Sequence, residues 1–313
     1  MTEKNLIVIT GPTASGKSAL AIDLAEKLQT SVISADSRQI YKGVPIATAV
    51  PDREELKDVP HHLLEILPLE AYYSASKFVE DSSEILKDIF ATHDYAIVCG
   101  GSMMYIDALI YGIDDLPTVP PELRDTLMNE WHEKGDLWLL DKLKSLDKIY
   151  YEKIDHRNLK RVFHAIEISL TAGKPYSSLL TGKSFEQKNP YNITKVCLDG
   201  NRDHLFERIN SRVIKMMEKG LEEEARSVYH LRHLNSLNTV GLKEMFAYFD
   251  GSLKKAEAVA RIQKNTRVYA KKQLTWHRRD NNIFNLNFSD SNRTNMERIL
   301  DRCLSSFKNH TQQ

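Results

Sequence analysis

The sequence predicts an α/β protein with a parallel sheet, helices on both faces of that sheet, and a helical insertion. Short apolar, β-branched runs alternate with helical patterns, which is typical of buried parallel strands. A glycine-rich turn joins the first run to the first helix, and a proline-rich stretch precedes a long helical segment. The 313 residues suffice for one such core with a sizeable insertion.

Four apolar runs are expected to form strands of this sheet. They are residues 6–10, 31–34, 94–99 and 194–198. A helical pattern from Ala19 to Leu28 follows the first run. An apolar stretch after Asp280 is expected to add an edge strand, and the chain from Arg202 to Asp280 is expected to be helical.

The domain boundary is predicted from prolines. Pro117, Pro120 and Pro121 interrupt any helix, and the pattern from Glu122 onward is helical and charged. We therefore expect a catalytic core from residues 1–120 and 191–313, and a helical insertion from residues 121–190.

Composition limits the function. Lys and Arg together equal Asp and Glu, at 43 each, so any nucleic-acid surface must be local. Cys99, Cys197 and Cys303 form no CxxC pair, which argues against a zinc site and a disulfide framework. Neither a signal peptide nor a membrane span is evident, so we expect a cytoplasmic protein, with a monomer as the default.

The glycine-rich turn matches the P-loop pattern G-x-x-x-x-G-K-[ST]. Its residues are Gly11, Pro12, Thr13, Ala14, Ser15, Gly16, Lys17 and Ser18. Backbone amides of such a loop surround phosphate oxygens, the lysine reaches the terminal oxygens, and the hydroxyl of Ser18 is a candidate Mg²⁺ ligand. The motif therefore predicts a diphosphate or triphosphate ligand without specifying ATP.

A P-loop alone does not distinguish GTPases, motor ATPases and kinases. No N-K-x-D guanine signature occurs, and the run ending at Cys99 continues into Gly-Gly-Ser where an ATPase would carry acidic residues. A small-molecule kinase and a non-catalytic RNA-binding protein stay open as alternatives. Asp36 and Ser102 follow neighbouring strands, so both are expected at the ligand edge of the sheet. Asp36 is a candidate metal ligand or general base, or alternatively a helix cap.

Several motifs in order resemble those of the tRNA dimethylallyltransferase (tRNA isopentenyltransferase) family, bacterial type. They are GPTASGKS, DSRQIYKG, HHLLEI, YSASKF, GGSMMY, RINSR, VGLKE and KKQLTWHRR, spread over residues 6–280. The resemblance implies a P-loop kinase-like core whose helical insertion grips the anticodon stem-loop of tRNA. It also implies transfer of a dimethylallyl group from dimethylallyl diphosphate to N6 of adenine 37, with Mg²⁺ as cofactor.

The resemblance implies catalytic roles for Asp36, Ser102, Lys17 and Arg208. Asp36 matches the base that accepts a proton from, or orients, the adenine amine. The P-loop, with Lys17, then holds the diphosphate, and Arg208 or Arg212 is a candidate additional clamp. A surface salt bridge is an equally good interpretation of either arginine. Ser102 stands where the family commonly has threonine, so its hydroxyl is kept.

The resemblance also implies tRNA contacts from the core and from the insertion. The core residues are Asp36, Ser37, Arg38, Gln39, Ser102, Asn238, Thr239, Val240, Gly241, Leu242 and Lys243, and the others are Arg124, Lys160, Arg161, Val162, Phe163 and His164. Arginine is frequent in the family at positions 164, 238 and 243, so individual contacts differ here.

Residues 254–279 carry nine Lys or Arg against one acid, and Lys264, Arg267 and Lys271 share one helical face. This face suits RNA phosphates, although a solvated helix face explains the same pattern. Trp276 is expected to be a core anchor. His61 and His62 are adjacent and would point to opposite faces of a strand, so they are not expected to ligate a metal.

Overall fold

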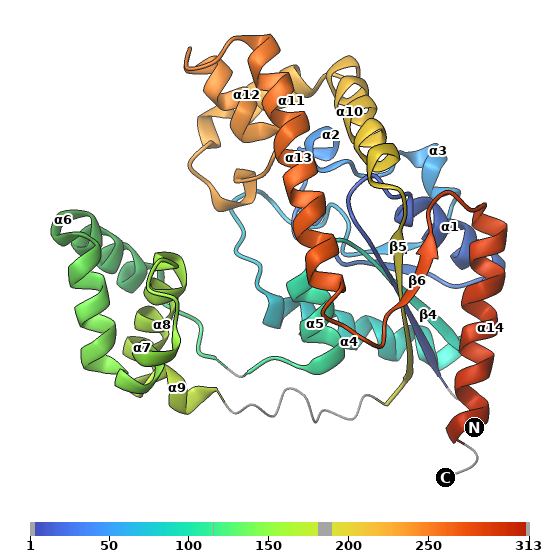
Figure 1. Cartoon of the computed structure of the whole chain (residues 1–313), viewed down its shortest axis with the longest axis horizontal. Helices are drawn as coiled ribbons and strands as arrows, with labels where there is room; N and C mark the ends of the chain where they lie inside the picture. Colours follow the sequence, from blue (N-terminus) through green and yellow to red (C-terminus); the bar gives the residue numbers. More distant parts are fainter. Residues whose placement is uncertain (1–3, 115, 181–189, 311–313) are drawn as a thin grey trace. The chain divides into compact units, whose positions relative to one another are not determined.

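A computed structural model describes residues 4–114, 116–180 and 190–310. Its centre is a six-stranded parallel sheet with the strand order β3-β2-β4-β1-β5-β6 (Figure 1). The strands are β1 (Asn5–Thr10), β2 (Val32–Ser34), β3 (His61–His62), β4 (Tyr95–Cys99), β5 (Asn192–Asp199) and β6 (Phe284–Asn287). The predicted α/β class is confirmed, and so are all five expected strands, while the two-residue β3 was not predicted.

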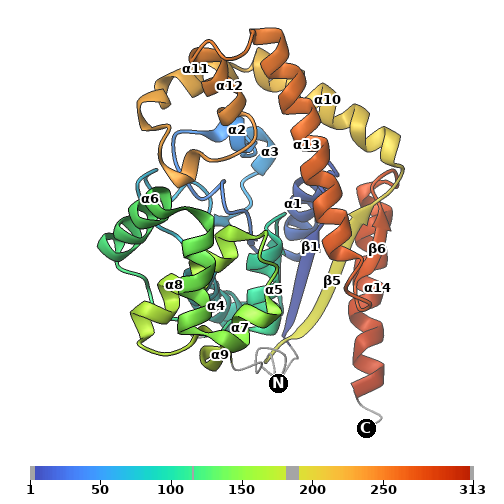
Figure 2. The same cartoon turned by 60° about the vertical axis from the view of Figure 1, so that its left-hand side comes forward.

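The helices cover both faces of this sheet, as right-handed crossovers require. On one face, α1 (Lys17–Leu28) and α14 (Asn292–His310) pack against the strands in one apolar cluster. On the other face lie α4 (Ala75–Thr92) and α5 (Met103–Tyr111) (Figure 2). There the rings of Phe78 and Tyr105 stack with centroids 4.6 Å apart. The chain leaves β1 toward β2 but returns from β3 toward β4, and this reversal opens a crevice at the carboxyl edge.

A second apolar core holds together the helices beyond the carboxyl edge of the sheet. Buried leucines and a methionine from several helices meet there, among them Leu221, Leu242 and Met245. The elements that contribute are α2 (Pro45–Thr48), α10 (Arg202–Glu218), α11 (Leu221–Ser227), α12 (Leu242–Phe249) and α13 (Lys255–His277).

The chain divides into two compact units, of which the second spans Tyr111–Gln187. This unit has its own apolar cluster, with Leu139 and Ile166 fully buried. Gly135 interrupts its longest helix with φ 80°. Its helices are α6 (Pro121–Leu146), α7 (Lys148–Lys153), α8 (Leu159–Ala172) and α9 (Tyr176–Leu179). That this unit is a tRNA-gripping insertion with limits at 121 and 190 stays a prediction. Among the described residues, no helix has the length and apolarity that crossing a membrane demands.

His277 anchors the end of α13 to the centre of the sheet. Its Nε2 lies 3.0 Å from Thr10 Oγ1, whose hydroxyl donates to Gly100 O at 3.2 Å. Since the single hydroxyl proton of Thr10 is used, Nε2 of His277 must carry the proton and donate to Oγ1. Burial, reinforced by the charges of Lys195 and Lys17, lowers the pKa of His277 to about 4. The imidazole is therefore neutral at physiological pH.

This pKa makes a prediction about stability. Above the unfolded-state pKa of about 6.5, the imidazole is neutral in both the folded and the unfolded chain, so it does not affect the free energy of unfolding. As the pH falls toward 4, the unfolded chain binds a proton at this histidine while the folded chain does not, so the free energy of unfolding decreases. We expect a loss on the order of 3 kcal/mol over that window. His277→Gln keeps an N–H donor and should flatten this part of the pH dependence, measured by urea unfolding. The exposed His230→Gln variant is the control, and identical curves for wild type and His277→Gln would contradict the prediction.

Candidate active site at the carboxyl edge of the sheet

The P-loop follows β1 and ends where α1 begins. Gly16 has φ 93°, a left-handed conformation that favours glycine, and no side chain caps the first amides of the helix. A Cβ on Gly16 would lie 3.1 Å from Arg208 Nη2. The loop is therefore a cradle that a side chain would partly fill, with helix amides turned toward an anion.

Not every amide of the loop is available to a ligand. Thr13 N donates to Gln273 Oε1 at 2.9 Å, and Ser15 N donates to Pro12 O at 3.2 Å. These two amides are therefore paired within the protein. Within the described parts of the chain, the remaining amides have no acceptor, and they are those of Ala14, Gly16, Lys17 and Ser18.

Three cationic side chains surround the loop. Lys17 Nζ donates to Pro12 O at 3.4 Å, and Arg212 Nη1 donates to Thr13 Oγ1 at 3.3 Å. Arg208, one turn earlier on α10, lies against Gly16. Burial lowers the pKa of Lys17 and of Arg212, while the nearby Asp36 carboxylate opposes both shifts. Concentrated positive charge in a partly desolvated position is what a diphosphate needs.

Both candidate arginines lie beside the P-loop. Arg208 Nη2 lies next to Gly16, and Arg208 Cζ is 5.3 Å from the centre of the Phe288 ring. Arg212 bonds the loop directly. Both arginines therefore approach the P-loop from α10, and among the described residues neither forms the surface salt bridge that sequence reasoning left open.

Asp36 and Ser102 are brought together by a backbone contact between β2 and β4. Ala35 N donates to Cys99 O at 2.8 Å, and Ser102 N donates to Ala35 O at 3.1 Å. Asp36 Oδ1 accepts from Arg38 N at 2.9 Å, which holds the carboxylate in an Asx turn. No described residue donates to Oδ2. The carboxylate is thus fixed by one oxygen and open at the other, and it does not cap a helix.

Sequence reasoning missed the inner face of α13. Gln273, with 1% of its surface exposed, donates through Nε2 to Gly101 O at 2.9 Å while accepting from Thr13 N. Tyr269 Oη lies 3.5 Å from the same carbonyl, although 40% of this residue is exposed. Both residues lie in or near the KKQLTWHRR motif, and their four-residue spacing was the available signal. Trp276 was expected to be a core anchor, but it is half-buried and lies outside the buried core, where its Nε1 donates to Asp107 Oδ2 at 2.7 Å.

A cavity of about 20 Å³ adjoins the loop and is lined by Ser18, Ser34, Gln39 and Cys99 among others. Ser18 therefore borders a small space beside the cradle. A hydroxyl oxygen suits Mg²⁺, which completes its shell with water and phosphate oxygens. Among the described residues, no group of three or more His, Cys, Asp or Glu side chains is placed to hold a metal ion.

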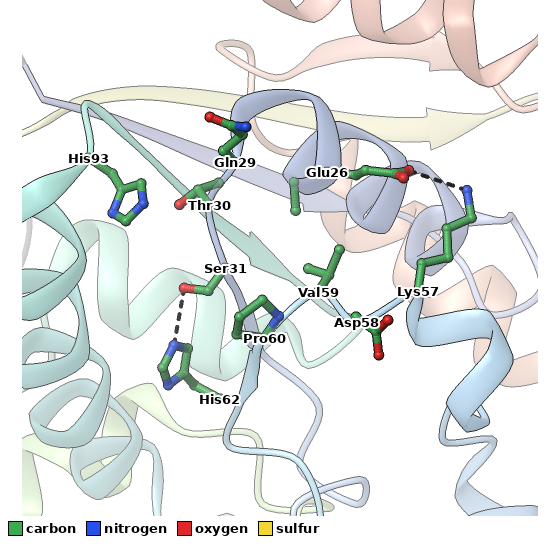
Figure 3. A pocket seen from close by; sticks show the side chains of 11 residues that line it. Glu26, Gln29, Thr30, Ser31, Lys57, Asp58, Val59, Pro60, His62 and His93 are labelled. Carbon is green, nitrogen blue, oxygen red and sulfur yellow. Dashed lines mark hydrogen bonds and ion pairs between the residues drawn. The ribbon is translucent and has the colours of Figure 1, made fainter.

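A larger cavity of about 510 Å³ lies elsewhere, at the opposite end of α1 (Figure 3). His62 Nε2 bonds Ser31 Oγ at 3.1 Å on its wall, and Lys57 pairs with Glu26 at 3.5 Å. His61 bonds Val59 O, so the two histidines have separate structural partners. None of the predicted site residues lines this cavity.

The predicted tRNA strips contain both exposed and buried side chains. In the core, Asn238 and Lys243 are exposed, but Leu242 is fully buried in the second apolar core. Arg38 donates to Asn235 O at 2.7 Å and Gln39 donates to Ala49 O at 2.9 Å, so both side chains shape the loop around Asp36. The prediction that the Leu242 side chain contacts tRNA is therefore wrong, because this side chain is buried in the second apolar core together with residues of α13.

The same correction applies within the helical unit. Val162 and Phe163 are buried in its core, with 0% and 3% of their surface exposed, so these side chains pack and do not face a ligand. Arg124 and His164 both approach the buried Glu167, at 3.3 Å and 2.8 Å. The contacts that stay predicted here are those of the exposed residues, namely Arg124, Lys160, Arg161 and His164.

The basic face of α13 is only partly free. Lys264 and Lys271 are exposed. Arg267 Nη1 donates to Asn210 Oδ1 at 2.5 Å and is half-buried. Lys271 Nζ lies 5.4 Å from the centre of the Phe206 ring. Of the three residues predicted to bind RNA phosphates, Lys264 and Lys271 therefore remain candidates, whereas Arg267 bonds within the protein.

Known proteins of one kind match this chain. The sequence model of the family described as IPP transferase matches residues 39–280. The chain is 50% identical to tRNA dimethylallyltransferase 1 of Porphyromonas gingivalis, over 90% of this chain and 93% of that protein. It is 44% identical to the tRNA dimethylallyltransferase of Christiangramia forsetii, over 92% and 95% of the two chains.

Solved structures agree with this assignment. The full-length tRNA isopentenylpyrophosphate transferase of Bacillus halodurans matches with a TM-score of 0.73 and 31% identity, over 99% of each chain. A eukaryotic dimethylallyltransferase captured acting on tRNA matches with a TM-score of 0.77 and 25% identity, over 92% of this chain and 74% of that one. The resemblance predicted from the motifs is confirmed: the chain belongs to the IPP transferase family and matches its bacterial members over nearly their whole length.

Proposed function

We propose that this protein transfers a dimethylallyl group from dimethylallyl diphosphate to N6 of adenine 37, beside the anticodon of tRNA. The observation that carries the proposal is the meeting of two opposite charges at one edge of the sheet. A phosphate cradle with Lys17, Arg208 and Arg212 adjoins the Asp36 carboxylate, which is near enough to act on the pKa of Lys17 and Arg212. Cations suit a diphosphate leaving group, and the carboxylate suits the amine that attacks.

The transfer is a substitution at an allylic carbon. The adenine N6 forms a bond to C1 of the dimethylallyl group while the bond from C1 to the diphosphate oxygen breaks. The open oxygen Oδ2 of Asp36 accepts the proton that N6 loses. The electron pair of the broken bond leaves on the diphosphate, where the free P-loop amides and the three cations stabilise it.

Ser102 belongs to the donor side of this reaction. Its backbone is fixed to Ala35, one residue before Asp36, and its hydroxyl is partly exposed. A hydroxyl there can donate to the bridging oxygen of the diphosphate as charge develops on it. Mg²⁺ coordinated by Ser18 would neutralise further charge on the departing diphosphate.

The adenine must leave its stack to reach Asp36. The loop that holds Asp36 is anchored through Arg38 and Gln39 to neighbouring backbone carbonyls, so it offers the flipped base a fixed edge. We assign phosphate contacts to the exposed lysines of α13 and to the exposed residues of the helical unit. A requirement for unpaired bases restricts the substrate to a loop of tRNA.

Prenyl transfer is tested with unmodified tRNA, dimethylallyl diphosphate and Mg²⁺, and mass analysis detects the prenylated adenosine. Wild-type protein should produce it. Asp36→Asn keeps the Oδ1 acceptor that holds Arg38 N, so the loop should persist while the rate falls at least ~10²-fold. Binding of tRNA should be unchanged. Consumption of ATP without prenyl transfer would favour the kinase alternative, and full activity of Asp36→Asn would remove the proposed base.

Arg208→Gln should raise KM for dimethylallyl diphosphate and lower kcat. A charged hydrogen bond to phosphate contributes roughly 1.5–3 kcal/mol, so kcat/KM should fall by roughly 10- to 100-fold. Arg293→Gln on α14 removes the same charge from a side chain that is 86% exposed and pairs only with Glu297. Steady-state kinetics compares the two variants, and equal values would place Arg208 outside the diphosphate site.

The double variant Lys264→Gln/Lys271→Gln should flatten the salt dependence of tRNA binding. Each lost phosphate contact lowers the slope of log K against log salt by about 0.7–0.9. Arg293→Gln/Arg298→Gln removes two charges from α14 and should leave the slope unchanged. Fluorescence binding curves at several salt concentrations measure both. An unaltered slope in the lysine variant would support a merely solvated face.

A further inference from the structure

The inner face of α13 crosses two loops of the site. Tyr269, Gln273 and His277 follow one another at four-residue intervals and therefore share one helix face. Their polar atoms contact the chain beside β1 and beside β4, at Thr10, Thr13 and Gly101. Of these three side chains, only Gln273 contacts both the P-loop and the turn that leads to Ser102.

The amide of Gln273 has one possible orientation. Thr13 N can only donate, so the atom facing it must be Oε1, and Gly101 O can only accept, so the atom facing it must be Nε2. Both distances are 2.9 Å, and the side chain is almost fully buried. A Cβ on Gly101 would lie only 2.4 Å from Nε2, so the turn approaches the amide closely because it has no side chain there.

This single amide sets the spacing between two parts of the site. Thr13 lies in the loop that leads to Lys17 and Ser18, which face the diphosphate in the proposed reaction. Gly101 precedes Ser102, whose hydroxyl faces the bridging oxygen. The ladder between β1 and β4 ends at Ile9 and Cys99, and Thr10 Oγ1 donates to Gly100 O just beyond it. Further along the two loops, the amide of Gln273 joins Thr13 to Gly101.

We propose that Gln273 is a positioning residue for prenyl transfer: it holds the P-loop and the Ser102 turn at the separation that the departing diphosphate requires. The assignment rests on the proposed function. Gln273 has no role as a base or a ligand here, because both polar atoms are used within the protein. Its contribution is geometric, and a misplacement of about 1 Å in such a site lowers rates by up to ~10²-fold.

Gln273→Leu removes both hydrogen bonds at similar volume, and we expect kcat to fall by roughly 10- to 100-fold with tRNA affinity nearly unchanged. Gln263→Leu is the matched control, since Gln263 lies on the same helix and donates weakly to Asn210 O at 3.4 Å, away from the P-loop. Single-turnover rates, tRNA affinity and melting temperature are measured on each. Full single-turnover activity of Gln273→Leu would overturn the assignment. So would a loss of activity no larger than the fraction of Gln273→Leu protein that is unfolded at the assay temperature.

Gln273→Glu separates positioning from simple packing. A protonated glutamic acid can accept from Thr13 N and donate to Gly101 O, whereas the carboxylate repels that carbonyl. Burial raises the pKa of such a group, so its protonated form extends toward neutral pH. The rate of the variant relative to wild type should therefore rise as pH falls from about 8 to about 6. A ratio independent of pH would contradict the proposal.

Different outcomes would refute the proposed function and the positioning role of Gln273. Wild-type protein without prenyl transfer would refute the proposed function, and the role of Gln273 with it. An active wild type whose Gln273→Leu variant is equally active would refute the positioning role alone.

Discussion

The site depends on the close contact between Gly100 and the carbonyl of Ala35. A Cβ on Gly100 would lie 2.0 Å from Ala35 O, so only glycine allows the ends of β2 and β4 to meet in this way. The hydrogen bonds from Ala35 N to Cys99 O and from Ser102 N to Ala35 O follow from that approach. Because Asp36 and Ser102 follow the ends of these two strands, one contact between backbones brings the proposed base and the Ser102 hydroxyl to the same edge of the sheet.

Charge then determines which side of the contact binds which substrate. The P-loop side carries Lys17, Arg208 and Arg212, whereas Asp36 supplies a carboxylate that is held by the amide of Arg38. Burial lowers the pKa of Lys17 and Arg212, and the nearby Asp36 carboxylate offsets only part of that shift. In the proposed reaction a diphosphate adds counter-charge beside these cations, and the departing diphosphate keeps its charge among them.

The sequence was sufficient for the features that depend on local pattern. Strands, the P-loop and the pairing of Asp36 with Ser102 follow from apolar runs and from the geometry of parallel sheets. Motif resemblance did not distinguish contact from packing, and so Val162, Phe163 and Leu242 were assigned to tRNA although their side chains fill apolar cores. The contacts of Gln273 could not be predicted from the sequence for another reason. Its role depends on two carbonyl and amide groups more than 170 residues away in sequence, and only the folded chain brings them to α13.

The position of the carboxylate explains how a P-loop can serve group transfer to an amine. β4 lies beside β1 and ends in Cys99 and two glycines, so the neighbour of the P-loop provides a hydroxyl at Ser102 and no acid. The acid comes from β2, one strand further out. An acid directly beside the loop would repel a diphosphate or bind its metal, whereas an acid one strand away faces the acceptor. In the proposed reaction, the phosphate cradle holds the leaving group, Gln273 fixes the distance between the loop and the Ser102 hydroxyl, and the acid is available to the attacking nitrogen.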